Sequence, residues 1–162
     1  YKAVLLEVGV GLDGGQVFYG NIGSYERMVN TVIGDNVNSA SRLEGLTRFY
    51  KVPIVCSEYV KDEVLQDSDY YRFVELDQVQ VKGKTKGKKI FWPVPNDQLD
   101  QQLQNDIDEY AAGLHLYYQG DWPAAHKHFS KSNLSAADMF RGRVEGKTAP
   151  DNWNGIWTMK EK

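Results

Sequence analysis

The sequence predicts a fold of the α/β or α+β class, in which a sheet packs against helices, and two observations carry this prediction. First, the segments before residue 96 read in the order β-β-α-β-α-β-β, which excludes a helical bundle and an all-β sandwich. Second, 41% hydrophobic and 25% charged residues in a chain of 162 are typical of a globular protein with one domain and an appendage. No window holds the roughly 18 apolar residues of a membrane helix.

The first predicted element is a buried strand at residues 3–10, which form an apolar and β-branched run. The "LDGG" that follows is a signal for a tight turn, and residues 16–23 then read as the partner strand of a hairpin. The chain opens with Tyr1 inside this apolar run, and we therefore expect further sequence upstream.

A helix is predicted over residues 34–50, because the less polar side chains recur on one side of the helical wheel. The members of that side are Ala40, Leu43, Leu46, Thr47 and Tyr50. The elements expected next are a strand at 52–57, a helix capped by Ser57, one or two strands at 70–81, a turn at 82–89 and a last strand at 90–95.

The C-terminal third of the sequence predicts helices. Residues 96–106 are polar and read as a linker or as the first turns of a helix. Two helical segments then flank "QGDWP" within residues 107–131, with small side chains on the seam between them. The tail carries Trp153 and Trp157, and because exposed tryptophans are a liability we expect both to pack on the rest of the chain.

The charge and the cysteine content exclude several classes of function. A net charge of −3 argues against general nucleic-acid binding. Cys56 is the only cysteine, which excludes an internal disulfide and favours a reducing, cytoplasmic setting. The histidines at 115, 126 and 128 lack the cysteine or carboxylate partners of a metal site and are expected at the surface.

Asn38 and Arg42 are the first candidate site residues. They lie one helical turn apart and away from the apolar side of the predicted helix, so their donors can together stabilise charge that develops on a substrate. The same spacing is that of a solvated helix face, which is the commoner setting of these residue types. Residues 82–89, with five lysines, likewise suit either a polyphosphate or a solvated hairpin tip.

Three motifs follow one another along the chain: "VGVGLDGGQVFYGNIGS" at 8–24, "TVIGDNVNSASRLE" at 31–44 and "VQVKGKTKGKKIFWPV" at 79–94. In residue types, order and spacing they resemble the catalytic domain of class III adenylate and guanylate cyclases. The resemblance covers residues 1–95 and corresponds to the C-terminal half of such a domain.

The resemblance implies a ferredoxin-like sandwich, with helices on one face of an antiparallel sheet, and two such domains paired head-to-tail around active sites at their interface. It implies attack of the ribose 3'-hydroxyl of a nucleoside triphosphate on its own α-phosphate, which gives the 3',5'-cyclic nucleotide and pyrophosphate. Two metal ions, Mg2+ or Mn2+, take part as in other phosphoryl transfers.

The resemblance also implies roles for four residues. Asn38 matches the asparagine that orients the ribose, and Arg42 matches the arginine that stabilises the transition-state charge on the α-phosphate. Lys82 matches the lysine that contacts the terminal phosphates. Thr31 stands where many members carry an adenine-reading aspartate and guanylate cyclases carry a cysteine. A threonine there resembles a bacterial subgroup, so ATP is the expected substrate.

The sequence departs from the family at the metal site. The two metal-binding aspartates and the adenine-reading lysine of the family precede the region where this chain begins, and Asp13 and Asp35 stand in the wrong motifs to replace them. We therefore expect no metal ligands in this chain and no activity of the chain alone. Activity is expected only if a second polypeptide supplies the first half of the domain. The expected protein partner is a homodimer partner or a complementing cyclase half, and membrane attachment is expected only through upstream domains.

Residues 107–131 resemble a single tetratricopeptide-type repeat, and one repeat cannot bury its own face. The expected division is a cyclase half at 1–95, a linker or helix start at 96–106, and a repeat-like hairpin with a tryptophan-rich tail at 107–162. The first interpretation is the C-terminal part of a bacterial adenylate cyclase. The alternatives are a cyclase-homology module that binds a nucleotide or a protein without catalysis, and an interaction module built on the repeat.

Overall fold

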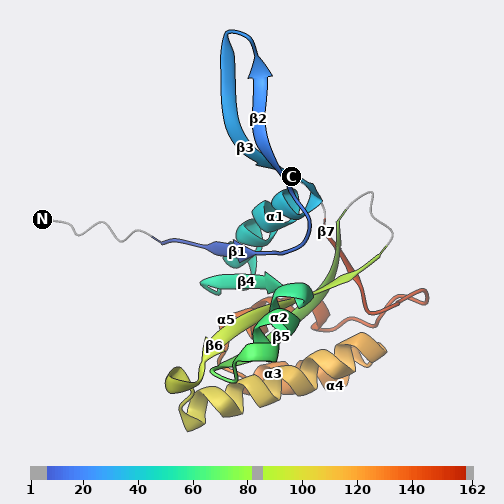
Figure 1. Ribbon diagram of the computed structural model, residues 1–162. Coiled ribbons are helices and arrows are strands. Elements are labelled where there is room, and N and C mark those ends of the chain that lie inside the picture. The colour runs from blue at the N-terminus through green and yellow to red at the C-terminus, as the bar shows by residue number, and fades with distance from the viewer. Residues whose placement is uncertain (1–6, 82–85, 160–162) are drawn as a thin grey trace, which may run out of the picture.

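Five strands form the central sheet of this mixed α+β fold (Figure 1). The computed structural model describes residues 7–81 and 86–159. Within them the sheet has the order β1 (Val10–Leu12), β4 (Ile54–Ser57), β6 (Lys88–Pro95), β5 (Tyr71–Val81) and β7 (Trp157–Met159). A separate antiparallel pair consists of β2 (Phe18–Ser24) and β3 (Arg27–Ile33).

The helix α1 (Asp35–Tyr50) forms where the sequence predicts it. Its buried residues are Leu43, Thr47 and Tyr50, and Ala40 and Leu46 beside them are half-buried. The predicted apolar side of this helix is therefore confirmed. The opposite side remains exposed to solvent.

The helix α2 (Glu58–Asp67) begins after Ser57, whose Oγ accepts a hydrogen bond from the Val60 amide at 3.3 Å. This contact confirms the predicted N-cap. The next element, β5, is one continuous strand with a shift in its pairing between Glu75 and Asp77.

The sheet is mixed, so the antiparallel sheet implied by the resemblance is wrong in part. β6 is antiparallel to β4 and to β5, but β1 pairs parallel to β4, and β7 pairs parallel to β5. Parallel neighbours require a crossover connection. The described residues supply two: one from β1 to β4, which includes α1, and one from β5 to β7, which includes β6 and the three C-terminal helices.

The hairpin predicted for the first two strands is wrong. β1 pairs with β4 and β2 pairs with β3, while residues 3–6 of the predicted first strand lie outside the described residues. The physical reason is the close approach of β1 to α1. A Cβ on Gly11 would stand 2.3 Å from the carbonyl oxygen of Ala40, so only glycine fits there. The tight turn lies instead at Tyr25 and Glu26, between β2 and β3.

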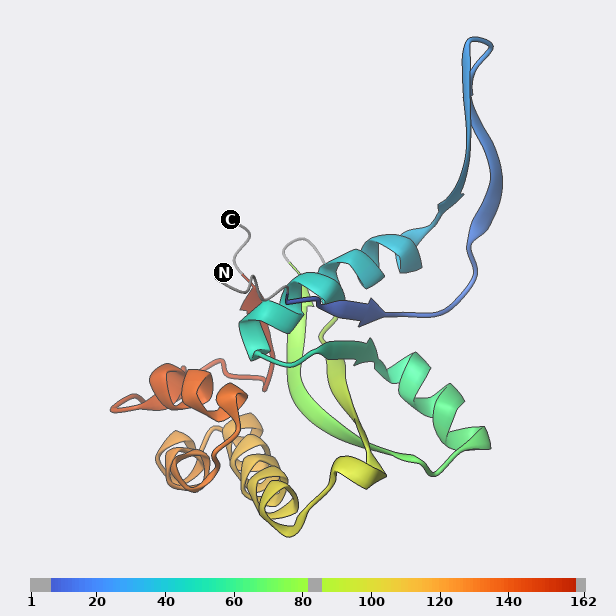
Figure 2. The same cartoon turned by 90° about the vertical axis from the view of Figure 1, so that its left-hand side faces the viewer.

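The β2–β3 hairpin projects away from the rest of the molecule (Figure 2). Phe18 and Tyr19 are 61% and 67% exposed, and as neighbours in a strand they point to opposite faces. Met28 and Val29 on β3 are exposed to a similar extent. Large apolar side chains thus face solvent on both sides of the hairpin, as on surfaces that contact other proteins.

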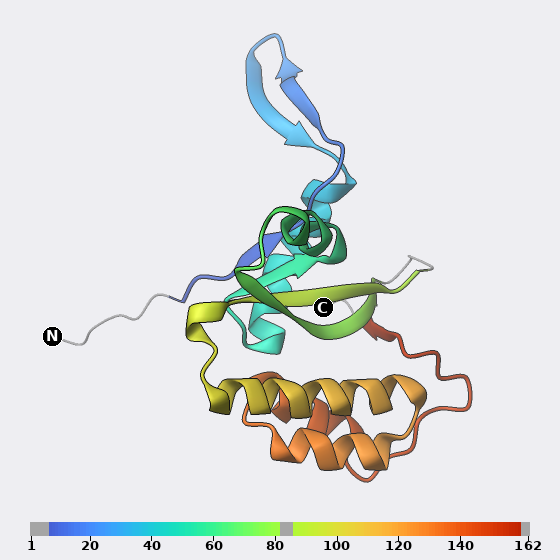
Figure 3. The ribbon, with the colours of Figure 1, turned by 60° about the horizontal axis from the view of Figure 1, so that its bottom comes forward.

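Three helices follow the sheet, after a short 3-10 turn, η1 (Asn96–Gln98). They are α3 (Gln101–Gln119), α4 (Trp122–Lys131) and α5 (Ser135–Val144). α3 and α4 lie side by side (Figure 3), and Gly113 of α3 leaves room for the Phe129 ring of α4. Among the described residues, none of the helices has the length and apolar character to cross a membrane.

Aromatic rings fill the space among these helices. The fully buried ones are Tyr110, Tyr117, Phe129 and Phe140. In the tail, the Trp153 Nε1 donates a hydrogen bond to the Tyr117 carbonyl oxygen at 2.9 Å, and the Trp157 ring lies 3.9 Å from the Arg143 guanidinium. The expectation that both tail tryptophans pack on the chain is therefore confirmed.

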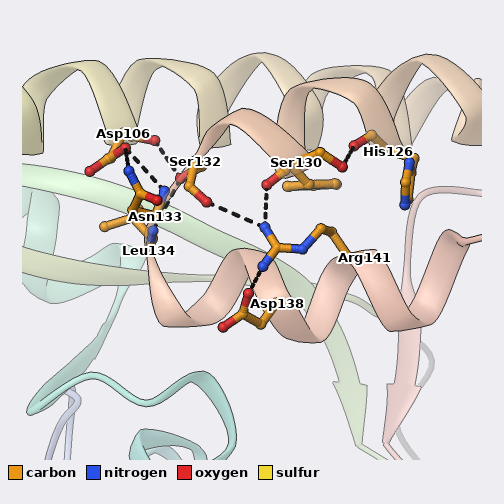
Figure 4. A network of polar contacts seen from close by, with 9 residues as sticks. Asp106, His126, Ser130, Ser132, Asn133, Leu134, Asp138 and Arg141 are labelled. Atoms are coloured by element: carbon orange, nitrogen blue, oxygen red, sulfur yellow. Dashed lines mark hydrogen bonds and ion pairs between the residues drawn. The ribbon is translucent and has the colours of Figure 1, made fainter.

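The segment between α4 and α5 is fixed by polar contacts (Figure 4). The Asp106 carboxylate of α3 accepts a hydrogen bond from the Asn133 amide at 3.0 Å, and the Ser132 hydroxyl donates to the Asp106 carbonyl oxygen at 2.8 Å. Arg141 of α5 donates to the Phe129 carbonyl oxygen at 2.7 Å. These contacts join the three helices to one another.

Candidate functional site

A cleft of about 380 Å3 opens between residues 35–46 of α1 and the neighbouring ends of β5 and β6. This volume lies within the range of pockets that hold small-molecule ligands. The lining residues are Asp35, Asn38, Ser39, Arg42, Leu43, Leu46, Val79, Lys86, Lys88 and Ile90. The cleft therefore brings two candidate features together, the Asn38 and Arg42 pair and the second half of the lysine-rich turn.

Asn38 and Arg42 reach the cleft from exposed positions on α1. Within the described part of the chain, no hydrogen bond joins either side chain to another residue. The helix is anchored by two residues outside the cleft, Thr47 and Tyr50, which are 3% and 0% exposed. Both polar side chains are thus available to a ligand, while the helix that carries them is anchored.

The cleft carries a surplus of positive charge. Among the described lining residues, Arg42, Lys86 and Lys88 contribute three cations and Asp35 contributes one carboxylate, which leaves a net charge of +2. The N-terminus of α1, where Gly34 provides no side-chain cap, lies at the same place and adds a partial positive charge. This balance suits an anion with several phosphate groups.

Asp13 stabilises the wall of the cleft from the end of β1. Burial acts to raise the pKa of its carboxyl, but hydrogen bonds with Ser39 and Ser57, a bond of 2.8 Å from the Gly14 amide and the charge of Lys88 together hold that pKa below its ordinary value. The ionised carboxylate therefore lies near Ser39 of α1 and near Ser57, which precedes α2. Sequence reasoning excluded Asp13 as a metal ligand but did not find this role.

Of the four residues implied by the family motifs, Asn38 and Arg42 line the cleft and Thr31 does not. Thr31 is half-buried on β3, before α1 begins. Lys82 lies outside the described residues. The structure adds Lys86 and Lys88, to which the sequence assigned no individual role. The lysine content of residues 82–89 is the signal that points to them.

The described residues do not fit a divalent metal site. Within residues 7–81 and 86–159, no three His, Cys, Asp or Glu side chains come together. Asp35, the one carboxylate among the cleft residues, shares the cleft with three cations, which would repel Mg2+ or Mn2+. The histidines lie on α3 and α4, where His128 pairs with Glu109 at 2.7 Å. His115 is exposed, as expected, whereas His126 and His128 are half-buried.

The sequence profile of the adenylate and guanylate cyclase catalytic domain matches residues 2–94. The "Adenylate cyclase" of Anabaena cylindrica is 39% identical over 87 residues, which cover 53% of this chain and 17% of that protein. The "Adenylate cyclase, terminal-differentiation specific" of Dictyostelium discoideum is 29% identical over 126 residues, which cover 76% of this chain and 6% of that protein. This chain therefore spans only a small part of the length of these relatives.

The crystal structure of the adenylyl cyclase CyaB from P. aeruginosa matches with a TM-score of 0.45 and 27% sequence identity. The match covers 54% of this chain and 42% of that one.

Proposed function

This chain belongs to the adenylate and guanylate cyclase catalytic domain family, and from that premise we propose that it forms part of an adenylate cyclase. In the proposed reaction the ribose 3'-oxygen of ATP attacks the α-phosphorus, loses its proton and displaces pyrophosphate, which gives 3',5'-cyclic AMP. Relatives that are adenylate cyclases support ATP as the substrate. Thr31 is the proposed base-reading residue.

The observation that carries this proposal is the cleft that Asn38 and Arg42 share with Lys86 and Lys88. In the proposed reaction negative charge grows on the oxygens of the α-phosphate, and the planar guanidinium of Arg42 offers several donors to them. Asn38, one turn earlier, is proposed to orient the ribose. The two lysines attract the β- and γ-phosphates, together with Lys82 as the proposed contact to the terminal phosphates.

We further propose that the site is completed by a second chain, either a homodimer partner or a complementing cyclase half, and that residues 1–162 alone are inactive. The exposed apolar faces of the β2–β3 hairpin support this, since they offer a surface for such a partner. Mg2+ or Mn2+ is the proposed cofactor, with ligands other than the described residues. When bound, these ions supply charge neutralisation of the triphosphate.

The proposed organisation follows the division expected from the sequence. Residues 1–95 form the C-terminal half of a cyclase domain with a ferredoxin-like arrangement, residues 96–106 connect it to the tail, and residues 107–162 form a tetratricopeptide-like unit. The packing of Gly113 against Phe129 supports the last of these assignments, because a repeat of this type needs small residues between its helices.

The proposed function is tested by Arg42→Ala in the assembled enzyme, with Arg48→Ala as the matched control. Arg48 lies on the same helix, is exposed, and pairs with Glu44 outside the cleft. We expect Arg42→Ala to lower kcat about 10²- to 10³-fold with a much smaller change in ATP affinity, because the interaction forms in the transition state. An equal loss of binding and turnover, or an equal effect of Arg48→Ala, would contradict the assigned role.

A second candidate function is a cyclase-homology module that binds a nucleotide without catalysis. No group of three or more His, Cys, Asp or Glu side chains among the described residues could hold a metal ion, and this observation favours the second candidate. Calorimetry with ATP, combined with measurement of cyclic AMP in the presence of Mn2+, separates the two. Binding without any cyclic AMP from the assembled protein would support the second candidate.

A further inference from the structure

A buried polar cluster joins the C-terminal helices to α1. Its centre is Asp77 of β5, which is fully buried. One carboxylate oxygen, Oδ2, accepts hydrogen bonds from the Tyr50 hydroxyl at 2.6 Å and from Arg143 Nη1 at 2.9 Å, and Oδ1 accepts one from the Gln78 amide at 2.8 Å. The last residue of α1, the middle of β5 and the end of α5 thus meet at one carboxylate.

Arg143 is fixed on the side of the C-terminal helices. Its Nη1 also donates to the Tyr117 hydroxyl of α3 at 3.1 Å, and its guanidinium lies 4.5 Å from the centre of the Phe140 ring and 3.9 Å from that of Trp157. Its Nη2 has no hydrogen-bond partner among the described residues. A cation buried in this way needs its carboxylate partner, so the position of Asp77 is coupled to that of α5.

The cluster bears on the cleft through the length of α1. Tyr50 ends this helix, and Asn38 precedes it by 12 residues, a rise of about 18 Å. Because Asn38 and Arg42 have no partner of their own in the described chain, the placement of the helix sets their positions. Because Gly11 of β1 packs on α1 between Ala40 and Glu44, the helix tilts about a point near residue 42. Asn38, about 6 Å before that point, then moves about half as far as Tyr50, about 12 Å after it. A displacement of about 1 Å at a catalytic group costs about a hundredfold in rate.

We propose that Tyr50 is a positioning residue: through its hydroxyl, the Asp77 carboxylate and Arg143, the C-terminal helices set the position of α1, and with it Asn38 and Arg42. The middle of α1 is held by β1 at Gly11, and Tyr50 holds the end. The C-terminal helices thereby contribute to catalysis by positioning residues of the site. The catalytic consequence rests on the proposed function, whereas the mechanical coupling does not.

The test compares Tyr50→Phe with Tyr110→Phe. Tyr110 is equally buried, and its hydroxyl donates to the Leu76 carbonyl oxygen at 2.6 Å, next to Asp77 on the same strand. Both variants therefore remove one buried hydroxyl that donates a hydrogen bond to β5, but only Tyr50→Phe removes a hydrogen bond between β5 and α1. Hydrogen exchange of the 162-residue chain and cyclase kinetics of the assembled enzyme are the two measurements.

We expect Tyr50→Phe to raise the exchange rate of the amides of residues 38–46 at least about threefold, whereas Tyr110→Phe raises exchange only in β5 and the C-terminal helices. In the assembled enzyme Tyr50→Phe should lower kcat about tenfold with KM for ATP changed less than about twofold, and Tyr110→Phe should leave kcat within about twofold.

Faster exchange confined to residues near position 50, or equal acceleration of α1 in both variants, would overturn the proposed coupling. Unchanged kcat of Tyr50→Phe in an active enzyme would overturn its catalytic consequence. If the unsubstituted assembled protein makes no cyclic AMP, the proposed function fails, and the exchange comparison still decides whether the C-terminal helices position α1.

Discussion

Replacing Arg143 by Met should make the stability of this protein depend strongly on pH, because the change leaves the Asp77 carboxyl buried without a cation. Burial raises the pKa of Asp77 in the native protein, and the Arg143 guanidinium opposes that rise. Without it, only the Tyr50 hydroxyl and the Gln78 amide still donate to the carboxylate. The pKa of Asp77 must then rise further, since desolvation is no longer balanced by an opposite charge.

The size of the effect follows from linkage. An acid whose pKa is higher in the folded than in the unfolded state contributes stability that is complete below the unfolded pKa, about 3.9 for Asp, and that is lost as pH rises toward the folded value. The loss is about 1.4 kcal/mol per pH unit, so a carboxyl that stays protonated in the folded state costs about 1.5 kcal/mol at pH 5 and about 4 kcal/mol at pH 7. Tyr50, Tyr110 and Tyr117 stay neutral throughout, because burial raises the pKa of each phenol.

Urea denaturation at pH 5, 6 and 7, followed by far-ultraviolet circular dichroism, measures this slope. Arg141→Met is the matched control, because the Arg141 guanidinium contacts the carbonyl oxygens of Phe129 and Ser132 and the carboxylate of Asp138 (Figure 4). The Asp138 side chain is 60% exposed, so the loss of stability in this variant should not vary with pH. The double variant Asp77→Asn with Arg143→Met lacks the titrating carboxyl, so its free energy of unfolding should not show this dependence on pH. If Arg143→Met lowers the free energy of unfolding by the same amount at pH 5 and at pH 7, the reasoning is refuted.

Three further predictions concern β1, the cleft and the nucleotide. Gly11→Ala should lower the free energy of unfolding by about 3 kcal/mol in urea denaturation, because its Cβ meets the backbone of α1; unchanged stability would contradict the close packing. Lys88→Ala should raise KM for ATP about tenfold with less effect on kcat, as expected for loss of a charged phosphate contact; an unchanged KM would remove Lys88 from the site. If Thr31 reads the base, cyclase assays with ATP and GTP in Mn2+ should favour ATP, and a preference for GTP would contradict that assignment.

The parts of the fold that follow from the sequence are those with a local cause. α1 has the period of an amphipathic helix and buries the predicted side, and Ser57 caps α2 as its position predicts. The prediction of a hairpin between the first two strands is wrong because the same glycine pattern is compatible with two structures. Glycines beside an Asp-Gly pair suit a tight turn, and the same glycines suit close packing of a strand on a helix. Gly11 serves the second purpose, and only the tertiary structure shows it.

The pair of Asp77 and Arg143 lies beyond what sequence can predict. The two residues are 66 positions apart, and Arg143 is separated by one residue from Arg141, which has the same chemistry and a largely local role. Helical periodicity does not tell which arginine of α5 enters the core. That choice is made when α5 docks next to β5 and when the Trp157 ring covers the guanidinium.

The face of α1 that carries Asn38 and Arg42 can be both exposed to solvent and functional. Residues of a site that a second chain completes must be exposed before assembly, and covering them excludes water and strengthens their interaction with charge. Exposure therefore does not separate Arg42 from an ordinary surface arginine. The two arginines differ in their partners. Arg48, six residues later, is also exposed but is neutralised by Glu44 at 2.5 Å. Arg42 has no partner in the described chain and shares the cleft with two lysines. Positive charges without a counter-ion repel one another strongly in a cleft with apolar walls, and binding of an anionic ligand relieves this repulsion.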